Sequence, residues 1–268
     1  MNESIFRQIG IAANYLDVDF DEQEMAQFAA DQDLSDNQLQ AVLKVFSHLK
    51  EKKEERIVST LLNSSRLPLS NPKSFDNFDF ALFHGKQKEV LKSLPTLSAL
   101  YAHKNLAFIG PQGVGKTHLA MAYGRACCQK GMKSYFLKAT ELNQKFTEAR
   151  KYGREDSCIS GLVRPSCLII DEMGRCVFSK ENTRMFFDVI DRRYNKEGPN
   201  TMIFTSNTGP DKWGEYFSED SSILCSLDRI FDVATVFYIK GSSYRGKGCE
   251  TIALTAGDPL TVTKAINK

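Results

Sequence analysis

Eight consecutive residues form a loop whose composition suits phosphate binding. Residues 110–117 read Gly-Pro-Gln-Gly-Val-Gly-Lys-Thr and follow an apolar run at 106–109. Glycines let successive backbone N–H groups turn toward phosphate oxygens, and a helix that starts here adds the positive end of its dipole. The motif's lysine reaches the β- and γ-phosphates, and its final hydroxyl ligates Mg²⁺. We therefore predict a site for ATP and Mg²⁺ built from Gly110, Pro111, Gln112, Gly113, Val114, Gly115, Lys116, Thr117 and His118. For His118, a place in the first helical turn is favoured over a catalytic role.

Two carboxylates follow a second apolar run. Residues 167–172 read Cys-Leu-Ile-Ile-Asp-Glu, as expected of a buried strand that ends in Asp171 and Glu172. At the strand tip, Asp171 would hold Mg²⁺, and Glu172 would orient and deprotonate an attacking water. Taken alone, the run would be read as a capped strand and an acidic turn. Its pairing with the phosphate loop favours the catalytic interpretation.

Two further polar residues follow this pair. Asn207 ends the next predicted strand, where its amide would reach the γ-phosphate or the water; the alternative is a turn residue. Arg229, in a Leu-Asp-Arg triplet, would neutralise transition-state charge in a neighbouring subunit. The alternative for Arg229 is a surface ion pair with Asp228 or Asp232.

Helices and strands alternate from residue 86 onward. The near-continuous apolar strands indicate burial on both faces of a parallel sheet, hence a doubly wound α/β fold with the nucleotide at the carboxyl ends of the strands. We predict strands at 105–109, 134–137, 167–170, 201–206 and 233–239. Helices are predicted at 86–101, 116–130, 140–151, 181–196 and 211–217, with a further turn near 222–230.

The chain divides into four predicted regions. Apolar residues at helical spacing over 38–62 indicate a helical N-terminal region at 1–62. A polar, proline-containing linker with a run of aromatic residues at 75–80 covers 63–85, the nucleotide-binding domain covers 86–247, and a tail covers 248–268.

Charge is distributed unevenly between these regions. Residues 1–43 hold nine acidic residues and one basic residue, Arg7, a net charge of −8, so the rest must carry +10 for the chain to reach +2. A basic body is compatible with nucleic-acid binding. No run of eighteen apolar residues and no signal-peptide pattern occurs, so we expect a cytoplasmic protein without membrane contact.

The order of the motifs resembles a known family. After the phosphate loop come Leu-Ile-Ile-Asp-Glu-Met-Gly at 168–174, Thr-Ser-Asn at 205–207, Trp-Gly-Glu-Tyr-Phe at 213–217, Leu-Asp-Arg at 227–229 and Gly-Ser-Ser-Tyr-Arg at 241–245. Over about residues 66–247 the chain is similar to the IstB-like ATPases, helper proteins of insertion-sequence transposition. These are relatives of the DnaC helicase loaders in the AAA+ initiator clade.

The resemblance implies an AAA+ P-loop NTPase that hydrolyses ATP and assembles as a homo-oligomer on DNA. Asn207 would match sensor 1, Arg229 the arginine finger supplied in trans, and Arg245 a nucleotide contact near the end of the core. The segment 140–164 falls where the clade carries a DNA-tracking helix. Its candidate contacts, for which a solvated helix face is the alternative, are Arg150, Lys151, Arg154 and Arg164.

The sequence departs from the family pattern at two places, of which the first should be harmless and the second keeps other functions open. Gln112 stands where a second proline is usual, and the N-terminal region is acidic rather than basic. The acidic region is compatible with an N-terminal head that docks on a protein. The sequence therefore allows two interpretations: a transposition helper that works with a transposase, or a DnaC-like loader that works with a replicative helicase. A non-hydrolysing, nucleotide-dependent scaffold is the third interpretation.

Overall fold

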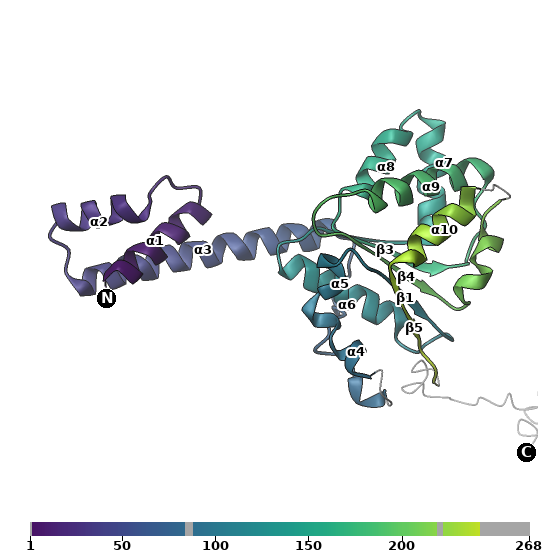
Figure 1. The fold of residues 1–268 in the computed structure, drawn as a ribbon, viewed down its shortest axis with the longest axis horizontal. Coiled ribbons are helices and arrows are strands. Elements are labelled where there is room, and N and C mark those ends of the chain that lie inside the picture. The colour runs from purple at the N-terminus through teal and green to yellow at the C-terminus, as the bar shows by residue number, and fades with distance from the viewer. Residues whose placement is uncertain (1, 84–87, 219–221, 242–268) are drawn as a thin grey trace, which may run out of the picture.

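The protein consists of a helical head and an α/β body joined by one long helix (Figure 1). This computed structural model describes residues 2–83, 88–218 and 222–241. The joining helix, α3 (Asp36–Ser64), has 29 residues and is therefore about 43 Å long. Its C-terminal end meets the body at β2, where the N–H of Phe136 donates to the carbonyl of Ser65 over 2.9 Å.

The body is built on a five-stranded parallel sheet with the order β2-β3-β4-β1-β5. Because every strand runs the same way, all carboxyl ends meet at one edge of the sheet. The order also separates β1 from β2 by two strands, which leaves a crevice after β1. The strands are β1 (Asn105–Ile109), β2 (Ser134–Lys138), β3 (Cys167–Met173), β4 (Thr201–Ser206) and β5 (Ala234–Tyr238).

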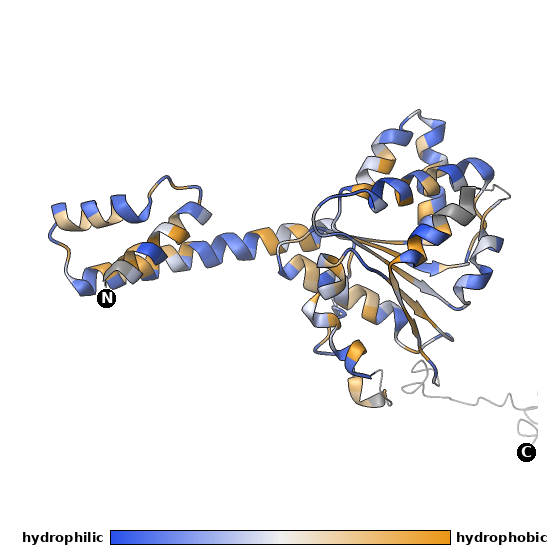
Figure 2. Ribbon diagram, in the orientation of Figure 1, coloured by the Kyte–Doolittle hydropathy of each residue, from blue (hydrophilic) through white to orange (hydrophobic). Residues whose placement is uncertain are grey.

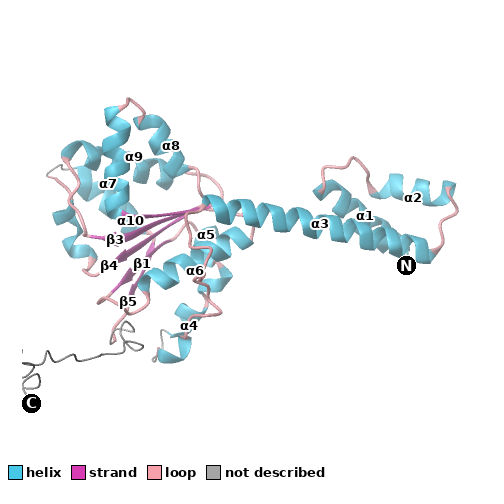
Figure 3. Cartoon of the chain, turned by 180° about the vertical axis from the view of Figure 1, so that it is seen from behind, coloured by secondary structure: helices cyan, strands magenta, loops and turns pink. Residues whose placement is uncertain are grey.

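Helices cover both faces of the sheet (Figure 3). One face packs against α7 (Ala139–Lys151), α8 (Glu155–Val163), α9 (Lys180–Tyr194), the 3₁₀ helix η3 (Pro210–Tyr216) and α10 (Ser222–Asp232). The other packs against α6 (Lys116–Gln129) and three short elements, α4 (Lys88–Lys92), η2 (Leu94–Thr96) and α5 (Ser98–Tyr101). A further 3₁₀ turn, η1 (Phe80–Leu82), lies in the segment after α3.

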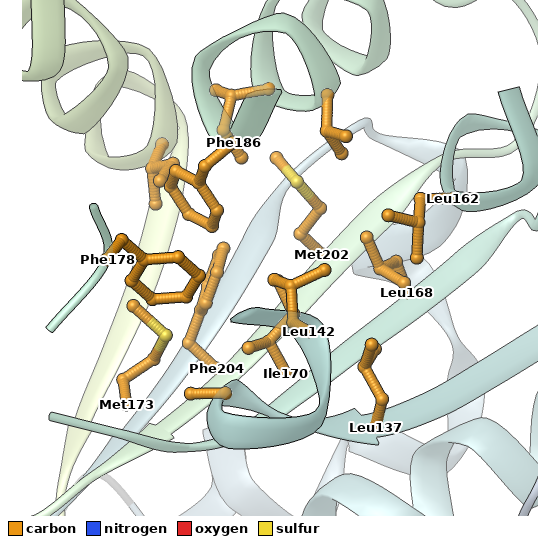
Figure 4. Packing of buried hydrophobic residues seen from close by; sticks show 14 of the residues in the cluster. Leu137, Leu142, Leu162, Leu168, Ile170, Met173, Phe178, Phe186, Met202 and Phe204 are labelled. Carbon is orange, nitrogen blue, oxygen red and sulfur yellow. The ribbon is translucent and has the colours of Figure 1, made fainter. Parts of the chain in front are cut away.

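Alternate residues of each strand fill the two cores. Along β3, Leu168 and Ile170 enter the cluster under α7–α9, while Cys167 and Ile169 enter the cluster under α6. Figure 4 shows the first of these clusters, where the rings of Phe178 and Phe186 have their centroids 5.7 Å apart. Burial on both faces explains why these strands are apolar throughout.

The head is a three-helix unit with its own small core. Helices α1 (Asn2–Tyr15) and α2 (Glu22–Asp31) pack together and α1 packs on the N-terminal half of α3 around Ile5, Ile9, Met25, Ala29 and Leu39. The middle of α3, where it leaves the head, is hydrophilic, and its last turns before the body are hydrophobic (Figure 2). In the hydrophilic part, Lys53 pairs with Asp17 at 2.6 Å and closes the head.

The expected helix at 86–101 is wrong as a single element. Over the described part, from residue 88, it is divided into α4, η2 and α5. Pro95 lacks the N–H that a helix interior needs, and Leu97 adopts a left-handed backbone with φ of 57°. The side chain of Leu97 is 2 % exposed, so core packing holds it in this costly conformation.

Other boundaries differ in smaller ways. Helix α8 was not predicted as a separate element; it starts after Gly153, whose φ of 62° ends α7. The turn near 222–230 is the helix α10, the element at 211–217 is the 3₁₀ helix η3, and β3 continues through Met173.

The doubly wound parallel α/β fold with a helical N-terminal region is confirmed. None of the helices in the described parts is long and apolar enough to span a membrane.

Candidate nucleotide-binding site

The phosphate loop joins β1 to α6 at the carboxyl edge of the sheet. Gly113 and Gly115 have φ of 80° and 94°, the region that glycine adopts without strain. A Cβ at Gly110 would lie 2.1 Å from the carbonyl oxygen of Ile239, and one at Gly115 would lie 3.0 Å from the ring of Phe78. Both positions therefore require glycine, because neighbouring segments pack directly against the loop. Val114 alone points into the core.

Lys116 folds back over this loop. Its Nζ donates to the carbonyl oxygens of Gly110 at 2.8 Å and Pro111 at 2.7 Å, and to Oδ1 of Asn207 at 2.9 Å. The side chain is 8 % exposed, so its charge is held in place by three oxygens. The structure thus brings the loop lysine together with the amide at the end of β4.

Asp171 is buried at the end of β3 and accepts two hydroxyl hydrogen bonds. Thr117 Oγ1 donates to its Oδ1 over 2.8 Å, and Thr205 Oγ1 does so over 2.5 Å. Burial raises the pKa of the Asp171 carboxyl, and the two hydroxyl groups partly offset this rise. A buried carboxylate beside a threonine hydroxyl offers the hard oxygen atoms that Mg²⁺ prefers.

Glu172 lies on a bulge in β3. The register with β4 shifts between Ile170 and Met173, and the φ of Glu172 is 58°, which costs about 1–2 kcal/mol in a residue with a Cβ. The N–H of Glu172 donates to Thr205 Oγ1 over 2.9 Å, which supports the bulge. The bulge turns two successive carboxylates in different directions, so that Glu172 remains partly exposed while Asp171 is buried.

Two cations hold the Glu172 side chain. Lys138 Nζ lies 3.4 Å from Oε2, and Arg175 Nη2 lies 3.5 Å from Oε1. We did not predict either residue. The signal for Lys138 was available, since it ends β2 and pairs in register with Asp171. Arg175 lies three residues after Glu172 and Thr205 two residues before Asn207. Only the turn after β3 and the register of β4 show which way these side chains face.

Lys116, Thr117, Glu172 and Arg175 line a cavity of about 770 Å³. Its walls are the phosphate loop, the turn at 172–175, the end of β4 from Thr205 to Thr208, and residues at 68–73 of the segment after α3. The volume is in the range of sites for ligands as large as a nucleotide. Tyr216 closes one side, where its hydroxyl hydrogen-bonds to that of Thr208.

His118 has a structural role in this wall. Its Nε2 lies 2.9 Å from the carbonyl oxygen of Ser74, and its ring lies against Phe78 with centroids 5.2 Å apart. Burial lowers the pKa of His118. These contacts attach the segment at 74–80 to the first turn of α6, so the aromatic run packs on the domain and supports the loop from behind.

Arg229 lies away from this cavity. On α10 its guanidinium is 2.6 Å from Asp191 and stacks over the rings of Phe187 and Tyr194 at 5.5 and 5.9 Å. The ion-pair partner is thus Asp191 of α9 and not the expected Asp228 or Asp232. The structure does not bring Arg229 to the phosphate loop of its own chain. Arg245 lies outside the described residues.

The four candidate DNA contacts separate into distinct groups. Lys151 and Arg154 lie together at the turn between α7 and α8, a hairpin that projects from the body (Figure 1). Arg150 is engaged by Asn182 at 3.2 Å and Glu181 at 3.7 Å. Arg164 is exposed at the opposite end of α8.

Comparison with known proteins shows a family that the chain matches. Residues 19–251 match the model of the IstB-like ATP binding protein family. The chain is 35% identical over 193 residues to the putative ATP-binding protein of insertion sequence IS5376 from Geobacillus stearothermophilus, covering 72% of this chain and 75% of that one. It is 32% identical to the corresponding IS232 protein of Bacillus thuringiensis subsp. berliner, covering 78% and 82%.

A solved structure shares the fold. AMPPCP-bound DnaA from Aquifex aeolicus superposes with a TM-score of 0.53 at 21% sequence identity, covering 66% of this chain and 52% of that one. At this identity the match shows the fold alone.

Proposed function

The chain belongs to the family of IstB-like ATP-binding proteins, and from this premise we propose that it hydrolyses ATP, with Mg²⁺, as a helper of transposition that acts on DNA. The observation that carries the proposal is the joint placement of Lys116, Thr117, Asp171, Glu172 and Asn207 at one edge of the sheet. These are the groups that phosphoryl transfer requires: cations, a metal ligand, and a base for water.

The donor set fits Mg²⁺ as well as ATP. Thr117 Oγ1 and Asp171 Oδ1 are 2.8 Å apart at the end of the phosphate loop. In the parts of the chain that the structure describes, no three His, Cys, Asp or Glu residues gather to hold a metal by themselves. Mg²⁺ characteristically uses one or two protein oxygens and completes its shell with phosphate and water. When bound there, it would neutralise charge on the β- and γ-phosphates.

Each residue then has a separate task. Backbone N–H groups of the loop and Nζ of Lys116 bind phosphate oxygens, and Asn207 orients Lys116 and the terminal phosphate. Thr117 and Asp171 hold the metal. Glu172 accepts a proton from the water that attacks the γ-phosphorus, and the bond to the bridging oxygen of ADP breaks. Burial of Lys116 and Asp171 strengthens these electrostatic contacts.

The surface of the body supports a contact with DNA. Lys151 and Arg154 project at the hairpin tip, where they would meet phosphates without reading sequence. The acidic head would be repelled by the same polymer, so a protein is its more favourable partner. The named relatives belong to insertion sequences, which makes a transposase the partner that we propose.

Two substitutions test the ATPase proposal. Lys116→Ala removes a charged phosphate contact and is expected to weaken ATP binding by about 100-fold. Glu172→Gln keeps the shape of the site, and we expect ATP binding to be retained with turnover reduced by at least about 100-fold. Binding of a fluorescent ATP analogue and phosphate release, each with and without DNA, measure the two effects. Equal turnover in the wild type and both variants would contradict the proposal.

A further inference from the structure

Arg175 differs from the other cation that holds Glu172. Both Lys138 and Arg175 lie about equally far from the carboxylate, at 3.4 and 3.5 Å, and their side chains are 49% and 50% exposed. Arg175, however, lines the 770 Å³ cavity, whereas Lys138 does not. Of the two cations that pair with Glu172, Arg175 therefore borders the space in which a nucleotide would lie.

The charges around the cavity favour a further cation that contacts the phosphates. Besides Arg175, the wall of the cavity holds the cations Lys116 and Lys73. Together with a bound Mg²⁺ they would offset the charge of a triphosphate, but Glu172 adds a negative charge to the same wall. A guanidinium presents a planar fork of N–H donors that matches phosphate oxygens better than it matches one carboxylate oxygen at 3.5 Å. A terminal phosphate would therefore compete with Glu172 for Arg175.

The backbone next to Arg175 is fixed, while its side chain is half exposed. Gly174 has φ of 95°, and the ring of Tyr216 packs so closely that a Cβ on Gly174 would lie 2.6 Å from it. The N–H of Arg175 donates to the carbonyl oxygen of Glu172 over 3.1 Å and closes the turn. The half-exposed side chain has the freedom to exchange one anion for another on this anchored turn.

From this geometry we infer that Arg175 contacts the terminal phosphate of the nucleotide bound to its own chain and releases Glu172 as it does so. Arg175 would thus read the difference between ATP and ADP, and the presence of ATP would free the base that acts on it. This inference rests on the proposed ATP binding and adds a residue to it.

Affinities for two nucleotides test the inference in the full chain. With Mg²⁺ present, Arg175→Ala should weaken binding of a nonhydrolysable ATP analogue by about tenfold. Binding of ADP should stay within about twofold, because ADP lacks the phosphate that Arg175 contacts. Lys138→Ala is the matched control, since it also removes a partner of Glu172. It should leave both affinities within about twofold of the wild type.

A double variant tests the competition itself. Glu172→Gln removes the rival anion, so the analogue should bind about threefold more tightly. That gain should vanish when Arg175→Ala is combined with it.

If the wild type binds neither nucleotide, the proposed function fails. If the wild type binds both but Arg175→Ala leaves analogue affinity unchanged, or weakens both nucleotides equally, the inference on Arg175 is overturned and ATP binding stands.

Discussion

At the scale of single residues, the site is organised by unequal burial of two adjacent carboxylates. Asp171 is 2% exposed and Glu172 is partly open to the cavity, because the bulge in β3 places them on different sides. Burial suits a group that must hold a metal, since the ionised form lacks water and gains strongly from a cation. Partial exposure suits a group that must accept a proton and pass it on.

The raised pKa of Asp171 leads to a prediction on stability. A carboxyl whose pKa is higher in the folded than in the unfolded chain costs stability once it is ionised. The cost is present at neutral pH and disappears as the pH falls through the folded-state pKa. Asp171→Asn keeps an acceptor for Thr117 and Thr205, and should raise the unfolding midpoint of the metal-free protein by a few degrees at neutral pH.

The measurement is thermal unfolding in chelator, near neutral pH and in mildly acidic buffer. The stabilisation by Asp171→Asn should shrink in acid, whereas exposed Asp76→Asn should change little at either pH. A gain for Asp171→Asn that is independent of pH would show that ionisation of Asp171 is not its source.

At the scale of elements, the α7–α8 hairpin carries two exposed cations at its tip, Lys151 and Arg154. Arg150 is held by Asn182 and Glu181, and Arg164 lies at the far end of α8. Lys151 and Arg154 flank Gly153 at the tip, with exposed Tyr152 between them. The turn made possible by Gly153 places two cations next to each other in space.

We therefore expect the tip, and not the whole helix, to contact DNA. Alanine at both Lys151 and Arg154 should weaken duplex binding by about tenfold or more and reduce the slope of log affinity against log salt by about two. Arg164→Ala, which changes an exposed arginine at the other end of α8, serves as control and should alter the slope by less. Anisotropy titrations over a range of salt concentrations give both quantities. Equal losses in all variants would favour general charge over a contact at the tip.

At the scale of the whole molecule, Arg229 requires a second copy if it is to act in catalysis. It lies on α10 with Asp191 and two aromatic rings, outside the cavity of its own chain. A partly exposed ion pair of this kind contributes up to about 1 kcal/mol, so Arg229 could leave Asp191 for a phosphate on a neighbouring copy at little cost in free energy. The acidic head stands away from this surface on α3 and leaves the body free to associate (Figure 1).

Mixing two inactive variants tests action across an interface. Arg229→Ala should reduce turnover by at least about 100-fold, and Arg229→Lys should not restore it, because lysine lacks the planar fork. A mixture of Arg229→Ala with Glu172→Gln should regain measurable turnover, since an interface between them pairs an intact cavity with an intact arginine. Sedimentation in ATP confirms assembly. Absence of recovery in assembled mixtures would remove Arg229 from catalysis.

What the sequence alone determined was the phosphate-loop motif and the alternation of strands and helices along the chain. Gly110 to Thr117 and the Asp171–Glu172 pair are local patterns, whose residue types and spacing predict phosphate and metal binding. The apolar strands predict a parallel sheet that is buried on both faces. The tertiary structure alone decided which side chains from other strands complete the site. Thr205, Lys138 and Arg175 meet the two acids only because β2, β3 and β4 are neighbours and β3 carries a bulge. Such contacts depend on strand order and register. Both are set by pairing between segments that are distant in sequence, so no local sequence pattern predicts them. The same reason divided the expected helix at Leu97, where packing outweighed local propensity.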